Sequence, residues 1–221
     1  MDRASREYVS DHLSLTTDGA AGKRPRRSAD ETRAEILNTA ETLFRSHGYA
    51  SVTIADIAAE LGMSPANVFK HFRTKTSLVD AIATRSIEKT LQVLKTLDGK
   101  APASQRLFAL AHDLMQSHLK KIEEAPYIFE MILVTVREEL DCGERFQEIM
   151  IETIAQIIQA GVDEGTYFVA DVPRFAQAAF NALACVIHPV MIANEKADIL
   201  ATRCREVVAL IDAALRSPLA K

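Results

Sequence analysis

Residues 53–72 read TIADIAAELGMSPANVFKHF, a stretch with the punctuation of two short helices joined by a tight turn. Thr53 can cap the first helix, and Gly62 stands where that helix can end in the left-handed conformation that glycine adopts at little cost. Ser64 then caps a second helix, and Pro65 occupies its first position, where the missing N–H is harmless. The pattern predicts a helix-turn-helix.

The second helix of this motif has small residues at its start and a cation and an imidazole at its end. Val68 and Phe72 lie four residues apart and are expected to face inward. The outward positions are then Pro65, Ala66, Asn67, Lys70 and His71. Such a face suits a helix whose N-terminus enters the major groove of DNA.

The segment LGMSPANVFKHFRTKTSLV at residues 61–79 resembles the signature of the TetR family of tetracycline-repressor-like regulators. The preceding AEILNTAETLFRSHGYASVTIADIA at residues 34–58 is similar to the family's first helix and its entry into the second. The match is specific over roughly residues 28–85, and beyond them it is architectural only. The resemblance implies DNA contacts by Thr53, Ser64, Pro65, Ala66, Asn67, Lys70, His71 and Lys75. Of these, Thr53, His71 and Lys75 are expected to touch the phosphate backbone.

One position departs from the family pattern. The family usually carries a tyrosine where Phe69 stands, and the tyrosine hydroxyl commonly reaches the DNA. Phe69 can stack or pack, but it has no hydroxyl with which to donate that hydrogen bond.

Charge is distributed unevenly along the 221 residues, although the net charge of −4 is modest. Residues 23–75 carry nine Lys and Arg against six Asp and Glu, whereas residues 76–221 carry 15 against 20. A basic head on an acidic body fits nucleic-acid contact at one end only. The cluster KRPRR at residues 23–27 is either a solvated charge run or an arm that lies along DNA.

Helical periodicity continues to the end of the chain, and no segment alternates as a strand does. The sequence therefore predicts an all-α fold of about nine helices. We expect three parts, a disordered basic arm (1–27), a helix-turn-helix DNA-binding domain (28–75) and a helical effector-binding and dimerisation domain (76–216). Within the last part, the helix after Pro126 is expected to be buried all round and to break at residues 141–143.

A small-molecule cavity is expected in the second domain, because TetR-like proteins usually bind an effector there. Its candidate lining residues are Met115, His118, Phe129, Met131, Phe180 and His188, each of which could equally be core. His118 is either a polar fixture in this cavity or a core histidine with one hydrogen bond. Pro189 either ends a helix early or kinks it and frees a carbonyl towards the cavity.

The last two long helices are expected to pair with their symmetry mates as a four-helix bundle. Small residues in the first let backbones approach closely, and the second has an apolar face too wide for one neighbour. The predicted interface residues are Ala178, Ala182, Val186, Val207, Val208, Ile211 and Leu215. The alternative is that both helices cap their own domain.

Catalytic signatures are absent from the sequence, with no G-x-S-x-G, P-loop, G-x-G-x-x-G or H-E-x-x-H motif. Three widely spaced cysteines predict no disulfide framework and no metal site, and we expect no cofactor. No secretory signal or membrane-spanning run is apparent, so a cytoplasmic protein is expected.

The sequence thus favours a homodimeric transcriptional regulator, most simply a repressor that a small molecule releases from a palindromic operator. Two alternatives remain. One is a ligand-independent DNA-organising protein of the same fold. The other is a carrier or enzyme built on the second domain, for which the sequence offers no convergent polar set.

Overall fold

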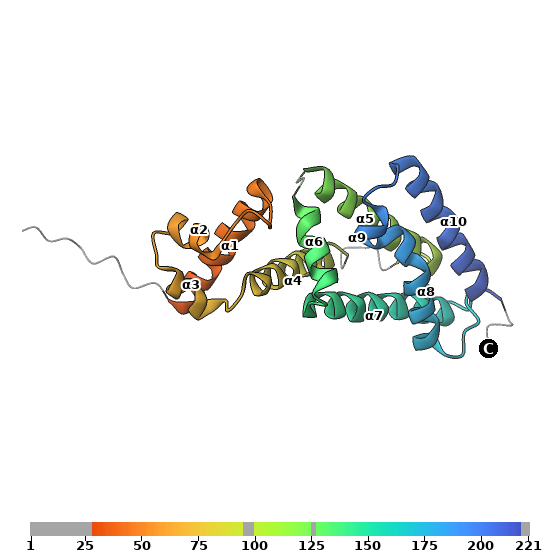
Figure 1. The fold of residues 1–221 in the computed structure, drawn as a ribbon. Helices are drawn as coiled ribbons and strands as arrows, with labels where there is room; N and C mark the ends of the chain where they lie inside the picture. Colours follow the sequence, from red (N-terminus) through yellow and green to blue (C-terminus); the bar gives the residue numbers. More distant parts are fainter. Residues whose placement is uncertain (1–27, 95–99, 125–126, 218–221) are drawn as a thin grey trace, which may run out of the picture.

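The structure is a computed structural model that describes residues 28–94, 100–124 and 127–217. Within these ranges it contains helices and no strand, which confirms the predicted all-α fold class (Figure 1). The first four helices are α1 (Ala29–His47), α2 (Ile54–Glu60), α3 (Pro65–His71) and α4 (Lys75–Leu94). The others are α5 (Ala103–Glu124), α6 (Ile128–Arg137), α7 (Asp141–Asp163), α8 (Val172–Ile187), α9 (Pro189–Ile192) and α10 (Ala197–Leu215). The arm expected at residues 1–27 lies outside the described residues.

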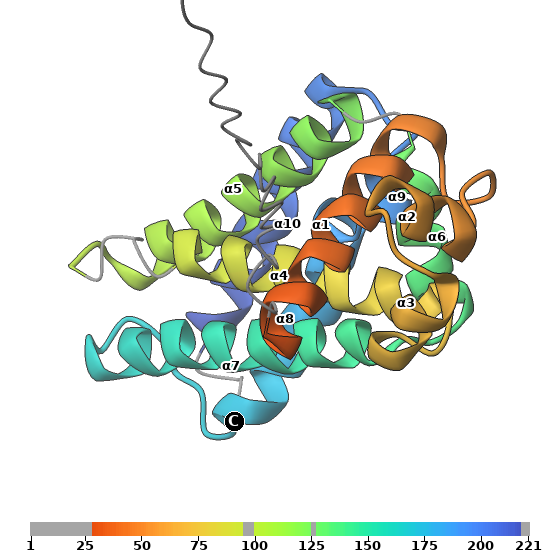
Figure 2. The same cartoon turned by 90° about the vertical axis from the view of Figure 1, so that its left-hand side faces the viewer.

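Local capping fixes the first three helices, as the sequence predicts. Ser28 and Thr53 each accept a hydrogen bond from the backbone three residues on, within complete capping boxes. Ser64 accepts from the amide of Asn67, and Gly62 has a φ of 63°. These local bonds place α2 and α3 in a helix-turn-helix at one end of the molecule (Figures 1 and 2).

We call α1–α3 the head. Its hydrophobic core also includes residues of α4 and α6. Leu78, Val79 and Ile82 of α4 are buried with the head's own apolar residues, and Ile128 and Met131 of α6 join the same cluster. The hydrophobic cluster therefore extends beyond residue 75. A division of the chain at that residue remains a proposal.

A second core fills the body, between α5, α7, α8 and α10. Tyr167 is buried there, and its hydroxyl donates to Asp212 at 2.8 Å. A Cβ atom on Gly161 would clash with the Tyr167 ring, because it would lie only 2.1 Å from the nearest ring carbon. Glycine at this position thus permits close packing of α7 against the loop that follows it.

Helix α6 is not buried all round, and the expectation from its apolar run is wrong. Only Ile128 and Met131 are buried, whereas Leu133 is 37% exposed and Val136 is 50% exposed. The helix packs against α1, α4, α5, α7 and α9 but leaves these two apolar side chains open to solvent, so apolar composition alone does not predict its burial.

The break between α6 and α7 falls earlier than residues 141–143. Glu139 adopts a left-handed φ of 47° after the end of α6, and residues 141–143 form the first turn of α7. Asp80 of α4 explains the early start, because its carboxylate accepts from the amide of Cys142 at 3.0 Å. This cap is 62 residues away in sequence, so no local pattern shows it.

Pro189 ends α8 and begins the single turn α9, which gives an early helix end and not a kink. The stretch Val172–Ile192, with a mean hydropathy of 1.6, is apolar and long enough to cross a membrane by composition alone. This stretch contradicts the expectation that no apolar run is long enough to span a membrane. This stretch is broken at His188, and its inward residues Ala176 and Leu183 belong to the body's core.

Candidate nucleic-acid interface and effector region

The outward face of α3 carries the predicted base-reading positions. Pro65, Ala66 and Lys70 are exposed, whereas Asn67 is half-buried and its side-chain amide donates to the sulfur of Met63 at 3.5 Å. Ser64 is exposed at the N-cap. The structure thus brings these residues together on one short helix.

Phe69 is 48% exposed on the same helix. An apolar ring that is half open to solvent on an otherwise small and polar face can stack or pack against a partner. Its position is compatible with contact to DNA, without the hydrogen bond that a tyrosine would donate.

Arg33 of α1 fixes the orientation of α3, a role that no sequence motif indicates. Its guanidinium donates to the backbone carbonyl of His71 at 3.0 Å and lies 4.1 Å from the ring centroid of Phe72. A cation at the C-terminal end of a helix also complements the helix dipole. Arg33 is distant in sequence from the motif, so only the fold shows this contact.

Lys75, which is predicted to contact phosphate, makes its contacts within the chain. Its ammonium donates to the carbonyls of Tyr49 at 2.5 Å and Val52 at 2.9 Å and lies 4.0 Å from the tyrosine ring centroid. Burial lowers its pKa, against the opposing charge of Glu130. Two of its three N–H bonds are used within the chain, so the geometry favours a role in holding the turn between α1 and α2.

The other two predicted phosphate ligands, Thr53 and His71, also make contacts within the head. The Thr53 hydroxyl donates to Asp56 at 2.7 Å and accepts from the Asp56 amide at 3.2 Å. His71 is half-buried at the end of α3. Both residues lie beside the exposed face of α3, and their contact with phosphate stays a prediction.

The predicted cavity residues do not form one group. Met115 is buried in the body's core and Phe180 packs against it, whereas Met131 belongs to the head's cluster and does not join them. Phe129 is half-buried on α6. Met131 is therefore wrongly assigned to a cavity in the body.

His118 is the core histidine with one hydrogen bond. Its Nδ1 donates at 2.8 Å to the carbonyl oxygen of Ile187, which the early end of α8 leaves without a helical partner. Burial lowers the pKa of His118 to about 4, and the positive charge of Lys121 and His188 acts in the same direction. The Nδ1 of His188 is buried without a hydrogen-bond partner among the described residues.

The described cysteines and acidic groups form no cluster that could hold a metal ion. Burial raises the pKa of the Cys142 thiol to about 12, and Asp80 adds to the effect. This thiol stays protonated and unreactive at neutral pH.

Two family models match this chain. The family described as bacterial regulatory proteins, tetR family, matches residues 36–82, and the tetracyclin repressor-like C-terminal domain matches residues 103–208. The chain belongs to the TetR family.

Relatives and solved structures agree with this assignment. The HTH-type transcriptional repressor KstR2 of Rhodococcus jostii is 26% identical over 168 residues, which cover 68% of this chain and 72% of KstR2. The HTH-type transcriptional regulator TtgR of Pseudomonas putida is 40% identical over 60 residues, covering 27% of this chain and 29% of TtgR. A transcriptional regulator from Saccharomonospora viridis, solved in complex with choline, has the same fold with a TM-score of 0.60 and 23% identity, covering 83% and 96% of the two chains. This TetR-family chain is a DNA-binding transcriptional regulator.

Part of the predicted dimer interface of this TetR-family regulator needs correction. Four of the seven predicted residues are buried in the protomer's own core and offer no surface to a second copy, namely Val186, Val208, Ile211 and Leu215. Ala178 and Ala182 are exposed on α8, and Val207 is half-buried. Ala178, Ala182 and Val207 remain available to a partner, and their place in a dimer interface stays a prediction.

Proposed function

We propose that this TetR-family regulator binds a palindromic operator as a homodimer and represses transcription until a small molecule releases it. The observation that carries the proposal is the exposed face of α3, with Pro65, Ala66 and Lys70 at the surface. Arg33 holds the C-terminal end of the same helix against α1 at 3.0 Å. A short, capped and clamped helix of this kind is suited to enter a major groove as a rigid unit.

The dimer is needed because one α3 reads only a few base pairs. Two heads related by a twofold axis would read half-sites about one DNA turn, ~34–36 Å, apart. A palindromic operator reflects that symmetry. If the separation of the two heads changes by a few ångström, they can no longer contact both half-sites at once.

The outward sides of α8 and α10 are the surface that we propose for dimerisation. Ala178 and Ala182 lie exposed on α8, and on α10 Leu210 is 72% exposed and Ile199 is 41% exposed. Small residues beside large apolar ones allow close helix packing. A twofold contact would bury these side chains and fix the distance between the two heads.

An effector is proposed because the S. viridis structure of the same fold was solved with choline. We also propose that the protein acts in the cytoplasm, without catalysis, since its chemistry is that of binding.

Sequencing of genomic DNA fragments recovered with the purified protein tests the proposal. A site-specific repressor should enrich a small set of fragments that share one palindrome. A DNA-organising protein of the same fold should recover fragments evenly, and that result would overturn the proposal. A metabolite screen by thermal shift then identifies compounds that stabilise the protein, because a bound ligand raises the unfolding temperature.

A further inference from the structure

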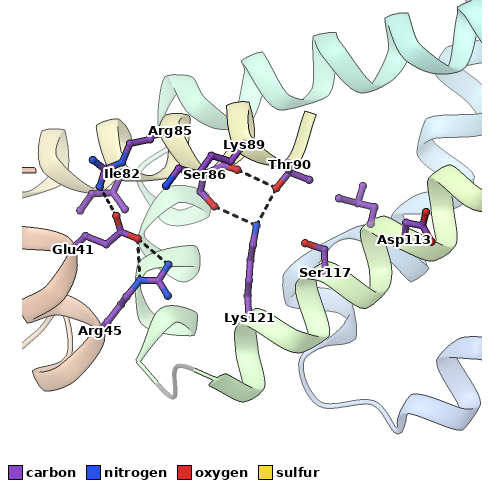
Figure 3. A pocket seen from close by; sticks show the side chains of 11 residues that line it. Glu41, Arg45, Ile82, Arg85, Ser86, Lys89, Thr90, Asp113, Ser117 and Lys121 are labelled. Atoms are coloured by element: carbon purple, nitrogen blue, oxygen red, sulfur yellow. Dashed lines mark hydrogen bonds and ion pairs between the residues drawn. The ribbon is translucent and has the colours of Figure 1, made fainter. Parts of the chain in front are cut away.

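A cavity of about 270 Å³ lies at the junction of the head and the body, between α1, α4 and α5 (Figure 3). It is lined by Glu41, Arg45, Ile82, Arg85, Ser86, Lys89, Thr90, Asp113, Leu114, Ser117 and Lys121. None of these residues is among the predicted cavity residues, and the half-buried His118 does not line the cavity.

Positive charge dominates the lining, with two arginines and two lysines against two acids. Glu41 is already engaged, because it accepts from Arg45 at 2.8 Å and pairs with Arg85 of α4. Burial alone would raise the pKa of Glu41, but the two arginines bring it below its ordinary value. Asp113 lies 3.2 Å from the His112 ring, and its side chain is 50% exposed.

Lys121 is the cation that lacks an acidic partner among the described residues. Its ammonium reaches from α5 to α4 and donates to the hydroxyls of Thr90 at 3.0 Å and Ser86 at 3.3 Å (Figure 3). Burial lowers its pKa, and the positive charge of Arg45 and Lys89 lowers it further. A partly buried ammonium held only by neutral hydroxyls is unfavourable, and an anion beside it would relieve that cost.

Apolar side chains complete the lining. Ile82 and Leu114 are buried at 3% and 0% exposure, respectively, and both border the cavity. The cavity therefore combines an apolar wall with a cluster of cations and with hydroxyl donors from Ser86, Thr90 and Ser117. Polar groups that converge beside an apolar wall can fix the orientation of a small molecule.

We propose that this cavity binds a small organic anion, a carboxylate or phosphate monoester with a short apolar tail, whose charged group lies between Lys121, Lys89 and Arg45. The anion would neutralise the ammonium of Lys121 and compete with Glu41 for Arg45. Its tail would lie against Ile82 and Leu114.

Occupancy would couple the body to the head, a consequence that rests on the proposed function as a regulator. The cavity takes Arg45 from α1 and Lys121 from α5, with α4 between them. An anion held by both helices changes the contacts that set the angle of α1, and binding of operator and anion would then affect each other reciprocally.

Isothermal titration calorimetry of the full-length protein tests the site with hexanoate, hexyl phosphate, inorganic phosphate and hexanol. We expect hexanoate or hexyl phosphate to bind and hexanol not to bind. The anion that binds more tightly shows whether the site prefers a carboxylate or a phosphate monoester. The variant Lys121→Met should weaken anion binding at least tenfold. Lys120→Met is the matched control, since Lys120 is the next residue on α5, is 73% exposed and pairs at 3.7 Å with Glu124 outside the cavity. Equal binding by hexanol, or unchanged binding in Lys121→Met, would overturn the site.

Lysine acetylation followed by peptide mass spectrometry repeats the test on the unaltered protein, free of any folding defect in a variant. The anion should slow modification of Lys121 several-fold and leave Lys120 unchanged. Protection of Lys121 by duplex DNA but by none of the anions would overturn the proposal and assign the cluster to nucleic acid. Equal protection of both lysines would also contradict it.

The regulatory consequence has its own readout. The anion should change operator affinity of the wild-type protein at least fivefold and that of Lys121→Met by less than twofold. Anion binding with no change in operator affinity would refute the coupling and leave the site standing. Absence of operator binding in all proteins would refute the proposed function, while calorimetry would still report on the cavity.

Discussion

The ammonium of Lys75 lies 2.5 Å from the backbone carbonyl oxygen of Tyr49 and 4.0 Å from the centroid of the same tyrosine ring. The carbonyl of Val52 accepts a second hydrogen bond at 2.9 Å. The first residue of α4 thus holds the turn between α1 and α2, and with it the entry into the helix-turn-helix. The phosphate contact that resemblance to the family implies for Lys75 stays a prediction, and holding this turn is the role that the geometry favours.

Substituting Lys75 with methionine should lower the free energy of unfolding by about 1 kcal/mol. The reason is that the carbonyls of Tyr49 and Val52 lose their donor while remaining partly buried. Urea unfolding measures the change. The slope of log affinity for DNA against log salt should stay at the wild-type value. A slope reduced by about one unit, with stability unchanged, would restore Lys75 as a phosphate ligand.

The double variant Asn67→Ala/Lys70→Ala should weaken operator binding by ~1–3 kcal/mol per lost base contact and should relax sequence preference. Lys70 is exposed and Asn67 is half-buried with one side-chain contact to Met63, so the fold should tolerate their removal. Fluorescence anisotropy with operator and scrambled duplexes measures both effects. Lys120→Ala, which removes a charge far from α3, is the control. Intact operator binding in the double variant would exclude α3 as the reading helix.

The free energy of unfolding should decrease as the pH is lowered, because the unfolded chain takes up a proton at His118 before the folded chain does. Burial lowers the folded-state pKa of this histidine to about 4, below the unfolded value of about 6.5. The unfolded chain therefore binds the proton first, and stability is full above about pH 6.5 and declines as the pH falls towards 4. The two values correspond to a loss of about 3 kcal/mol. Burial also lowers the pKa of His188, which acts in the same direction.

Urea unfolding between pH 7 and pH 4 measures this loss. The variant His118→Leu should be less stable than wild type at pH 7 and should show a shallower decline. His112→Gln, a change at a partly exposed histidine on the same helix, should keep the wild-type pH profile. Identical pH profiles for wild type and His118→Leu would show that His118 does not govern the acid sensitivity.

Local patterns predict the head of this protein well and its long-range contacts poorly. Ser28, Thr53 and Ser64 cap their own helices, so the boundaries of α1–α3 follow from neighbouring residues. The start of α7 depends on Asp80, and the orientation of α3 depends on Arg33, each contact linking distant parts of the chain. Such contacts have no periodicity that a single sequence could reveal.

The body shows the same limit in its helix faces and its cavity. Helices α8 and α10 are apolar over wide arcs, so periodicity alone did not show that Val208 faces the core and Leu210 faces outward. The charged cavity is assembled from three helices, and its key ammonium, on Lys121, looks like an ordinary surface lysine in sequence.

Placing a charge at Leu210 should separate the proposed dimer without unfolding the protomer. Leu210 is 72% exposed, so Leu210→Glu is tolerated by a single chain but is unfavourable in an apolar contact. Sedimentation should show a folded monomer. Val208→Glu is the informative comparison, because Val208 is only 4% exposed and a charge there should unfold the body. A Leu210→Glu protein that remains dimeric would move the interface elsewhere.

The most direct test of paired reading heads is operator affinity after inserting five base pairs between the half-sites. This insertion rotates one half-site by about half a DNA turn, so two heads fixed by one dimer cannot meet both major grooves from the same side. Fluorescence anisotropy at constant salt should show affinity falling to the non-specific level, ~10³-fold or more below the unaltered operator. Unchanged affinity for the extended operator would contradict a homodimer that reads a palindrome with two α3 helices.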